Sequence, residues 1–84
     1  MGIERILSSP GRLRVLKIIL KHGQINITRL AREASVHHHL ASKYVNELES
    51  EGIVSVRRIG RLRIVEINIE NPKVALLREL LLGE

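Results

Sequence analysis

The sequence predicts a mainly helical α+β fold with one small β-hairpin, in the order helix, short strand, helix, helix, hairpin, helix. Apolar residues recur at helical spacing along most of the first 50 residues. The period then changes to two from Ile53 onward, which is typical of strands. A third observation is length, because a chain of 84 residues holds one domain. We therefore expect a single domain over residues 1–84.

Ser9 and Pro10 predict the start of the first long helix. Serine caps helix N-termini and proline suits the first helical position. The helix should end at His22 and Gly23. Its buried positions are predicted to be Leu13, Val15, Leu16, Ile19 and Leu20, and an apolar stripe before it begins with Ile3, Ile6 and Leu7.

A strand and a short helix are predicted next. Ile25 and Ile27 alternate with polar neighbours, which indicates a short strand, and Thr28 is predicted to cap a helix beginning at Arg29. The narrow buried face of this helix should consist of Leu30, Ala31 and Ala34, and Val36 should anchor the turn that follows.

The following helix should run from about His38 to Ser50, with Gly52 as its C-terminal stop. Ala41, Val45 and Leu48, at spacings of four and three, should face the core.

A hairpin and a last helix complete the chain. The hairpin should turn at Ile59 and Gly60, with Gly60 at positive φ because a branched residue disfavours that conformation. Asn71 and Pro72 should start the last helix. The predicted strand residues are Val54, Val56, Val65, Ile67 and Ile69, and the last helix carries Val74, Ala75, Leu76, Leu77, Leu80, Leu81 and Leu82. A helix that is apolar on all sides must be buried against the rest of the chain or against a second protein chain.

Composition excludes several classes of function. The absence of cysteine excludes disulfides, thiolate metal sites and redox switching. Paired carboxylates in a pocket and a glycine-rich phosphate loop are both missing, so we expect neither an enzyme nor a cofactor. No apolar run approaches the length of a membrane span, so we expect no membrane contact and a cytoplasmic, nucleoid-associated location. The net charge of +5 favours a polyanionic partner, a nucleic acid above all.

One face of the helix predicted at residues 38–50 carries groups that read base edges. Lysine can donate to guanine and asparagine can make a two-point contact with adenine, as expected for Lys43 and Asn46, with Ser42 beside them. A solvated helix face is the alternative. Tyr44 could pack at the core edge or point its hydroxyl at a phosphate. The acidic run Glu47, Glu49 and Glu51 indicates that the distal end of the helix faces away from DNA.

Three consecutive histidines, His37, His38 and His39, precede that face. Consecutive helical side chains point about 100° apart, so these imidazoles cannot converge on one ion, and we predict no metal site. They either contact DNA or form an exposed row with no role.

The hairpin is strongly basic. Arg57, Arg58, Arg61 and Arg63 stand against Glu66 alone between residues 53 and 69, a net +3 (4 − 1). Such a ribbon can straddle phosphates or enter the minor groove, and a solubility device is the alternative. On the first long helix, the basic residues Arg12, Arg14, Lys17 and Lys21 could be further phosphate contacts or a solvated face.

Several segments in this order resemble the winged helix-turn-helix family of transcriptional regulators, closest to its arsenic-repressor-like (ArsR-type) branch and archaeal relatives. The segments are residues 7–16 (LSSPGRLRVL), 27–33 (ITRLARE) and 44–54 (YVNELESEGIV), together with the basic hairpin as the wing. The sequence departs from that branch at the histidine row, where serine or threonine caps are usual, and lacks its metal-sensing ligands. The resemblance therefore implies the fold without metal sensing, and no pocket for a small-molecule effector is legible.

This resemblance implies a homodimer that binds specific double-stranded DNA and regulates transcription. The recognition helix would enter the major groove while the wing holds the backbone. DNA contacts are expected at Thr28, His37, His38, His39, Ser42, Lys43, Tyr44, Asn46, Arg57, Arg58, Arg61 and Arg63. Segments 1–9 and 71–84 should form the dimer interface through Ile3, Ile6, Leu7, Leu77, Leu80 and Leu81. A non-specific architectural DNA-binding protein and a winged-helix protein-interaction module remain as alternatives.

Overall fold

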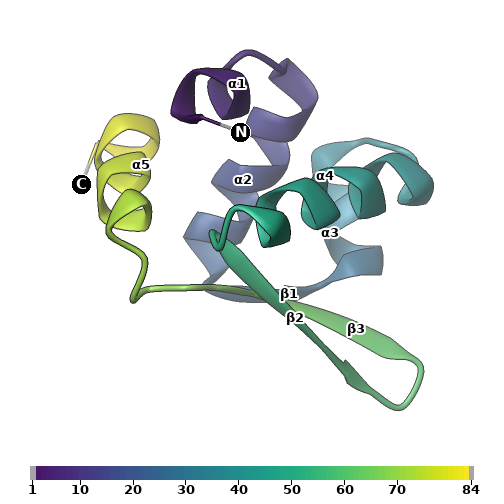
Figure 1. Cartoon of the computed structure of the whole chain (residues 1–84). Helices are drawn as coiled ribbons and strands as arrows, with labels where there is room; N and C mark the ends of the chain where they lie inside the picture. Colours follow the sequence, from purple (N-terminus) through teal and green to yellow (C-terminus); the bar gives the residue numbers. More distant parts are fainter. Residues whose placement is uncertain (1, 84) are drawn as a thin grey trace.

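The computed structural model describes residues 2–83, so the outermost residue of each predicted dimer segment lies outside the described range. Over these residues the chain forms five helices and a three-stranded antiparallel sheet, and the mainly helical α+β prediction is confirmed (Figure 1). The elements are α1 (Ile3–Leu7), α2 (Pro10–His22), β1 (Gln24–Asn26), α3 (Ile27–Ala34), α4 (His38–Ser50), β2 (Val54–Ile59), β3 (Leu62–Ile67) and α5 (Pro72–Leu82).

Local signals in the sequence set most helix ends. The Ser9 side chain accepts a hydrogen bond from the Arg12 amide at the start of α2, and Asn71 caps α5 by accepting from the Lys73 amide. Gly52, with φ of +74°, follows α4 and satisfies the predicted stop. The predicted bounds of α2 and α4 are therefore confirmed.

The start of α3 is a correction. Asn26, not Thr28, caps the helix by accepting from the Arg29 amide at 2.8 Å, and Ile27 is its first residue. Ile27 is only 3% exposed, because it enters the core as a helical residue and does not continue the strand. Thr28 therefore lies exposed within the first turn of α3.

The hairpin differs from its prediction at both ends. Ile59 is the last residue of β2 and pairs with Leu62, so the two-residue turn is Gly60-Arg61. Gly60 has φ of +60°, as expected. At the other end β3 stops at Ile67, because Asn68 bonds back to the Gly52 carbonyl at 2.9 Å and turns the chain. Ile69 is therefore 75% exposed instead of lying in the sheet.

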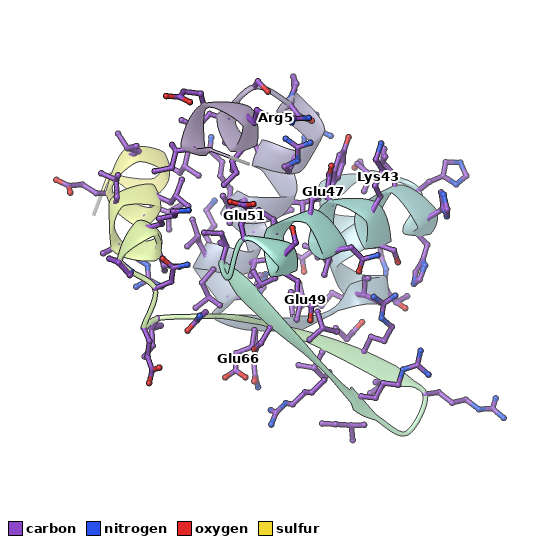
Figure 2. The ribbon with its side chains drawn as sticks, in the orientation of Figure 1. Arg5, Lys43, Glu47, Glu49, Glu51 and Glu66 are labelled. Carbon is purple, nitrogen blue, oxygen red and sulfur yellow. The ribbon has the colours of Figure 1, made fainter. Side chains whose placement is uncertain are left out.

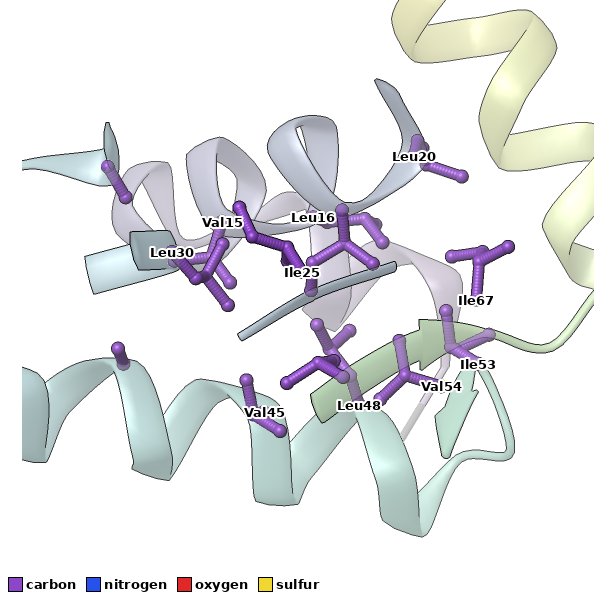
Figure 3. Packing of buried hydrophobic residues seen from close by; sticks show 14 of the residues in the cluster. Val15, Leu16, Leu20, Ile25, Leu30, Val45, Leu48, Ile53, Val54 and Ile67 are labelled. Atoms are coloured by element: carbon purple, nitrogen blue, oxygen red, sulfur yellow. The ribbon is translucent and has the colours of Figure 1, made fainter. Parts of the chain in front are cut away.

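The sheet has the order β1-β3-β2, so β2 is an edge strand and the β2-β3 hairpin projects from the helical body (Figure 1). The core lies between α2, α3, α4 and the base of this sheet (Figure 3). Leu16, Leu30, Leu48 and Val65 are fully buried there. Such a core fixes the direction of α4 relative to the wing, which positions the surface described next.

Candidate nucleic-acid interface

The exposed side of α4 forms an open hollow. Its lining residues are His39, Ser42, Lys43, Asn46, Glu47 and Ser50. Lys43 and Asn46 are exposed, and Ser42 is half-buried. The structure thus brings the three predicted base-reading residues together on one face of α4, opposite the buried Ala41, Val45 and Leu48.

The first turn of α4 is open at its N-terminus. His37 occupies the N-cap position without a side-chain capping bond, and no acidic residue stands in the first turn. All three histidines of the row are exposed. Within residues 2–83 no group of three potential metal ligands gathers anywhere, at the histidine row included.

Ser42 connects α4 to the wing. Its Oγ accepts a hydrogen bond of 3.1 Å from Arg63 Nη1 on β3. Arg63 in turn is the cross-strand partner of Arg58, so two guanidinium groups stand opposite each other on one face of the hairpin. Like charges placed directly opposite destabilise a strand pair, unless an anion lies between them.

The other wing arginines differ in their contacts. Arg57 lies on the opposite face of the hairpin and donates to Gln24 Oε1 on β1 at 3.4 Å. Arg58 and Arg61 are exposed, and their side chains form neither a hydrogen bond nor an ion pair with any residue in the described part of the chain. Their charges are available to an outside partner.

Tyr44 lies at the core edge, not on the open face. The Arg12 guanidinium carbon stands 5.8 Å from the Tyr44 ring centroid, a cation–π contact. The ring also covers Gly11 so closely that a Cβ there would meet the Tyr44 hydroxyl at 2.6 Å. Of its two sequence interpretations, the geometry therefore supports the structural one.

Arg12 fits neither of the two interpretations offered for the basic residues of α2, a phosphate contact or part of a solvated face. It is 9% exposed and donates from Nε and Nη2 to the two Glu47 carboxylate oxygens at 3.2 and 3.3 Å. Its Nη1 donates to the Arg5 carbonyl of α1. Arg12 therefore connects α1, α2 and α4, and its guanidinium is occupied by partners within the fold. The sequence could not reveal this, because Glu47 lies 35 residues away.

Figure 2 shows Glu47 beside Lys43 on α4, with Glu66 on the sheet below. The Glu47 charge is compensated by Arg12, at 3.2 Å between nitrogen and oxygen. Glu47 lines the same hollow as Lys43 and Asn46, so the acidic run does not turn wholly away from this face of α4.

The predicted dimer residues fall into two groups. Ile6 and Leu77 have no exposed surface in the single chain, so they belong to its core and cannot contact a second chain directly. Ile3, Leu7 and Leu81 are partly buried, whereas Leu80 is 58% exposed. Leu76, on the same helix, is 44% exposed and was missing from the predicted set.

Among the described residues no helix has the length and hydropathy needed to cross a membrane.

Comparison with known proteins places this geometry in a family. The model of the MarR family matches residues 9–60, from the cap of α2 to the turn of the wing. No protein of curated function matches the sequence.

Solved structures match the fold closely. The AntR antimony-specific transcriptional repressor superposes with a TM-score of 0.81 and 25% identity over 95% of this chain and 70% of that chain. A homodimeric winged helix-turn-helix DNA-binding domain from Mycobacterium bovis, of a possible ArsR-family transcriptional regulator, gives 0.75 and 26% over 95% and 71%. Sso10a-2, a DNA-binding protein from Sulfolobus solfataricus, gives 0.65 and 25% over 84% and 74%.

The predicted fold and regulator class are thereby confirmed. AntR is a transcriptional repressor and the Mycobacterium bovis domain belongs to a possible transcriptional regulator, which agrees with the expectation that the chain is not an enzyme. The family model covers more than half of the 84 residues. The chain therefore belongs to the MarR family of winged helix-turn-helix transcriptional regulators.

Proposed function

We propose that this chain binds specific sequences in double-stranded DNA as a dimeric transcriptional regulator. In this proposal α4 enters the major groove, where Lys43 and Asn46 read base edges, and the wing holds the neighbouring backbone. The observation that carries the proposal is the opposed pair Arg58 and Arg63 on the hairpin, with Arg63 bonded to Ser42 of α4. A phosphate beside this pair would relieve its repulsion and fix α4 relative to the backbone.

The start of α4 supports a second backbone contact. Its first amide groups lack a side-chain acceptor at His37, and helix N-termini bind phosphate through such amides. His38 and His39 are exposed beside them and would add donors to phosphate or base edges. Thr28, exposed in the first turn of α3, and the unpaired Arg61 at the wing tip are proposed as further backbone contacts.

Dimerisation is proposed through α1 and α5. Leu76 and Leu80 expose 44% and 58% of their surface on α5, and Leu81 of α5 with Ile3 and Leu7 of α1 are partly buried. Two such helices from two protomers would cover each other and set the separation of the recognition helices at about one helical turn of DNA. The similar domain from Mycobacterium bovis is homodimeric, which supports dimerisation as such.

Oligomeric state is tested by sedimentation equilibrium of Leu80→Lys. We expect monomers, because a buried lysine at a dimer interface is strongly unfavourable. Ile69→Lys is the matched control, since Ile69 is 75% exposed and lies outside α1 and α5. A Leu80→Lys protein that still sediments as a dimer would place the interface elsewhere.

A second candidate is a non-specific architectural DNA-binding protein. Sso10a-2, a neighbour of similar fold, is described as a DNA-binding protein and not as a regulator, so this candidate is tested beside the first. Both candidates predict steep loss of affinity with salt, so the ratio between specific and non-specific affinity separates them.

The test uses fluorescence anisotropy with duplexes selected from a random pool and with unselected duplex, across a salt series. A palindromic sequence bound at least about a thousandfold more tightly than unselected duplex supports the regulator. Equal, steeply salt-dependent binding to both supports the architectural protein, and no binding at low salt contradicts both.

Single substitutions distinguish residues that read bases from residues that contact the DNA backbone. Asn46→Ala should reduce discrimination between duplexes, whereas Arg61→Ala should weaken binding to all duplexes and lower the salt slope. Lys21→Ala, an exposed lysine at the end of α2, is the charge-matched control and should have little effect. If Lys21→Ala weakens binding as much as Arg61→Ala, general charge and not this surface binds DNA.

A further inference from the structure

The Glu47 carboxylate lies on the surface proposed to bind DNA. It lines the hollow on α4 together with Lys43 and Asn46, and 30% of its side chain is exposed. A carboxylate repels phosphates, so it would weaken binding on a surface that contacted the DNA backbone alone. Its position among the proposed base-reading residues therefore favours a partner other than a phosphate.

Arg12 holds this carboxylate in one orientation. Its Nε and Nη2 donate to the two Glu47 oxygens at 3.2 and 3.3 Å. Its Nη1 donates to the Arg5 carbonyl of α1, and the guanidinium lies over the Tyr44 ring. Contacts to two other helices therefore fix the Arg12 side chain, and through it Glu47 is positioned before any partner binds.

Glu47 keeps acceptor positions that the fold does not use. An ionised carboxylate has about four lone-pair sites, and the two Arg12 bonds occupy two of them. Lys43 lies four positions earlier on α4, the usual spacing of intrahelical ion pairs. It nevertheless forms no ion pair with any of residues 2–83. The Lys43 ammonium and the remaining Glu47 lone pairs are therefore both available to an outside partner.

The base edges in the major groove determine which base fits Glu47. Cytosine presents only a donor there, its exocyclic amino group. Guanine presents two acceptors, thymine an acceptor and a methyl group, and adenine an acceptor beside its amino group. An ionised carboxylate can only accept, so each base other than cytosine places an acceptor against it. We infer that Glu47, oriented by Arg12, selects cytosine at one position of each half-site.

This inference rests on the proposed function, and it adds a constraint on the sequence that is bound. Lys43 and Glu47 are one helical turn apart, about 5.4 Å, and base pairs stack about 3.4 Å apart. Because lysine donates to guanine, the selected cytosine should lie within about two base pairs of a guanine contacted by Lys43. Glu47 thus contributes specificity without adding affinity for the backbone.

The test selects duplexes from a random pool with the full chain and with Glu47→Gln. Fluorescence anisotropy then compares the four bases at each half-site position. Glu47→Gln keeps the shape of the side chain and an acceptor for Arg12, but it removes the charge. Glu49→Gln is the matched control, because Glu49 is exposed on the same helix and does not line the hollow. Urea denaturation verifies that each variant is folded.

Wild type and Glu49→Gln should prefer cytosine at one position by at least about tenfold. Glu47→Gln should lose this preference or shift it to adenine, because glutamine can make a two-point contact with adenine. Both variants should bind unselected duplex more tightly, since each loses a negative charge.

Two results would overturn the inference alone: a wild-type half-site without a cytosine preference, or an unchanged preference in Glu47→Gln. Either result would leave Glu47 as a structural partner of Arg12. Failure of wild type to bind any duplex would overturn the proposed function as well.

Arg12→Lys tests the positioning role separately. Lysine keeps the positive charge but lacks the planar fork that bonds both carboxylate oxygens, so Glu47 should be held less firmly. The cytosine preference should fall severalfold while the affinity for unselected duplex stays the same. Weaker binding to all duplexes with an unchanged preference would show a general structural role for Arg12 and contradict the positioning of Glu47.

Discussion

Arginine has two different environments in this molecule. Arg12 is 9% exposed, pairs with both oxygens of Glu47, donates to the Arg5 carbonyl and lies over the Tyr44 ring. Arg58 and Arg61 on the wing are exposed, and their side chains have neither a hydrogen bond nor an ion pair to any of residues 2–83. The same charge therefore stabilises the fold in one place and remains available for a partner in the other.

The comparison shows why net charge alone cannot locate a DNA-binding surface. Arg12 adds to the formal charge of +5, but its field is compensated by Glu47. The wing arginines act on their surroundings because no carboxylate among residues 2–83 forms an ion pair with them. Whether a basic side chain has an acidic partner within the fold, and not the number of basic residues, therefore decides whether its charge stabilises the fold or is available to bind DNA.

The largest expected effect comes from removing the partnered arginine. Arg12→Met leaves Glu47 without its partner and detaches α1 from α4, so we expect a loss of about 2 to 3 kcal/mol in the free energy of unfolding, measured by urea denaturation. The loss should lie below that of a fully buried pair, because the Glu47 side chain keeps 30% exposure.

Arg61→Ala is the control for this comparison, and its stability should stay within about 0.5 kcal/mol of wild type. Equal destabilisation by Arg12→Met and Arg61→Ala would remove the distinction between the two environments.

The packing around Arg12 gives a second, smaller effect. Gly11→Ala would place a Cβ at 2.6 Å from the Tyr44 hydroxyl and 3.0 Å from the ring. The strain should exceed the gain of up to about 1 kcal/mol that alanine brings to a helix, leaving a net loss of about 1 kcal/mol in urea denaturation. In the Tyr44→Ala background the same change should become stabilising. A destabilisation that persists there would contradict the Tyr44 contact.

These partners also mark the limit of sequence-based prediction. Local signals such as Ser9-Pro10, Asn71-Pro72 and Gly52 correctly predicted helix ends, because caps and stops depend on residues a few positions apart. The choice between Asn26 and Thr28 as a cap depended on Ile27 entering the core, which is a tertiary effect.

The candidate surface was predicted in outline for a similar reason. Helical spacing brings Ser42, Lys43 and Asn46 onto one face. The Arg63–Ser42 bond spans 21 residues and the Arg12–Glu47 pair spans 35, and no local period encodes such contacts. The sequence therefore predicted which side chains share the exposed face of α4, but not which basic side chains find a partner elsewhere in the fold.

Arg58→Ala tests the unpartnered side. Removing one of two opposed guanidinium groups should leave the free energy of unfolding unchanged or raise it by about 0.3 kcal/mol, because the two like charges repel each other across the strands. The same change should lower the salt slope of duplex binding by about 0.9 for each lost phosphate contact. Urea denaturation and anisotropy across a salt series measure the two effects. A clear loss of stability would show that Arg58 has a structural partner.

The smallest effect concerns Arg29, a third environment in which an arginine is exposed but partnered. His22 and Arg29 donate to the Glu33 carboxylate at 2.9 and 2.6 Å, and these bonds hold the Glu33 pKa below its ordinary value of 4.5. Since the pKa is depressed in the folded state, the stabilisation is present above pH 4.5 and is lost as the pH falls through the folded-state value.

Glu33→Gln should therefore lower the urea midpoint slightly at pH 7, and the difference from wild type should vanish at strongly acidic pH, where the carboxyl is protonated in both states. The effect should be small because Arg29 is 54% exposed and exposed ion pairs are weak. A difference that grows on acidification would contradict the depressed pKa. If Glu33→Gln lowered the free energy of unfolding at pH 7 as much as Arg12→Met does, exposure would not determine how strongly an arginine–glutamate pair stabilises this fold.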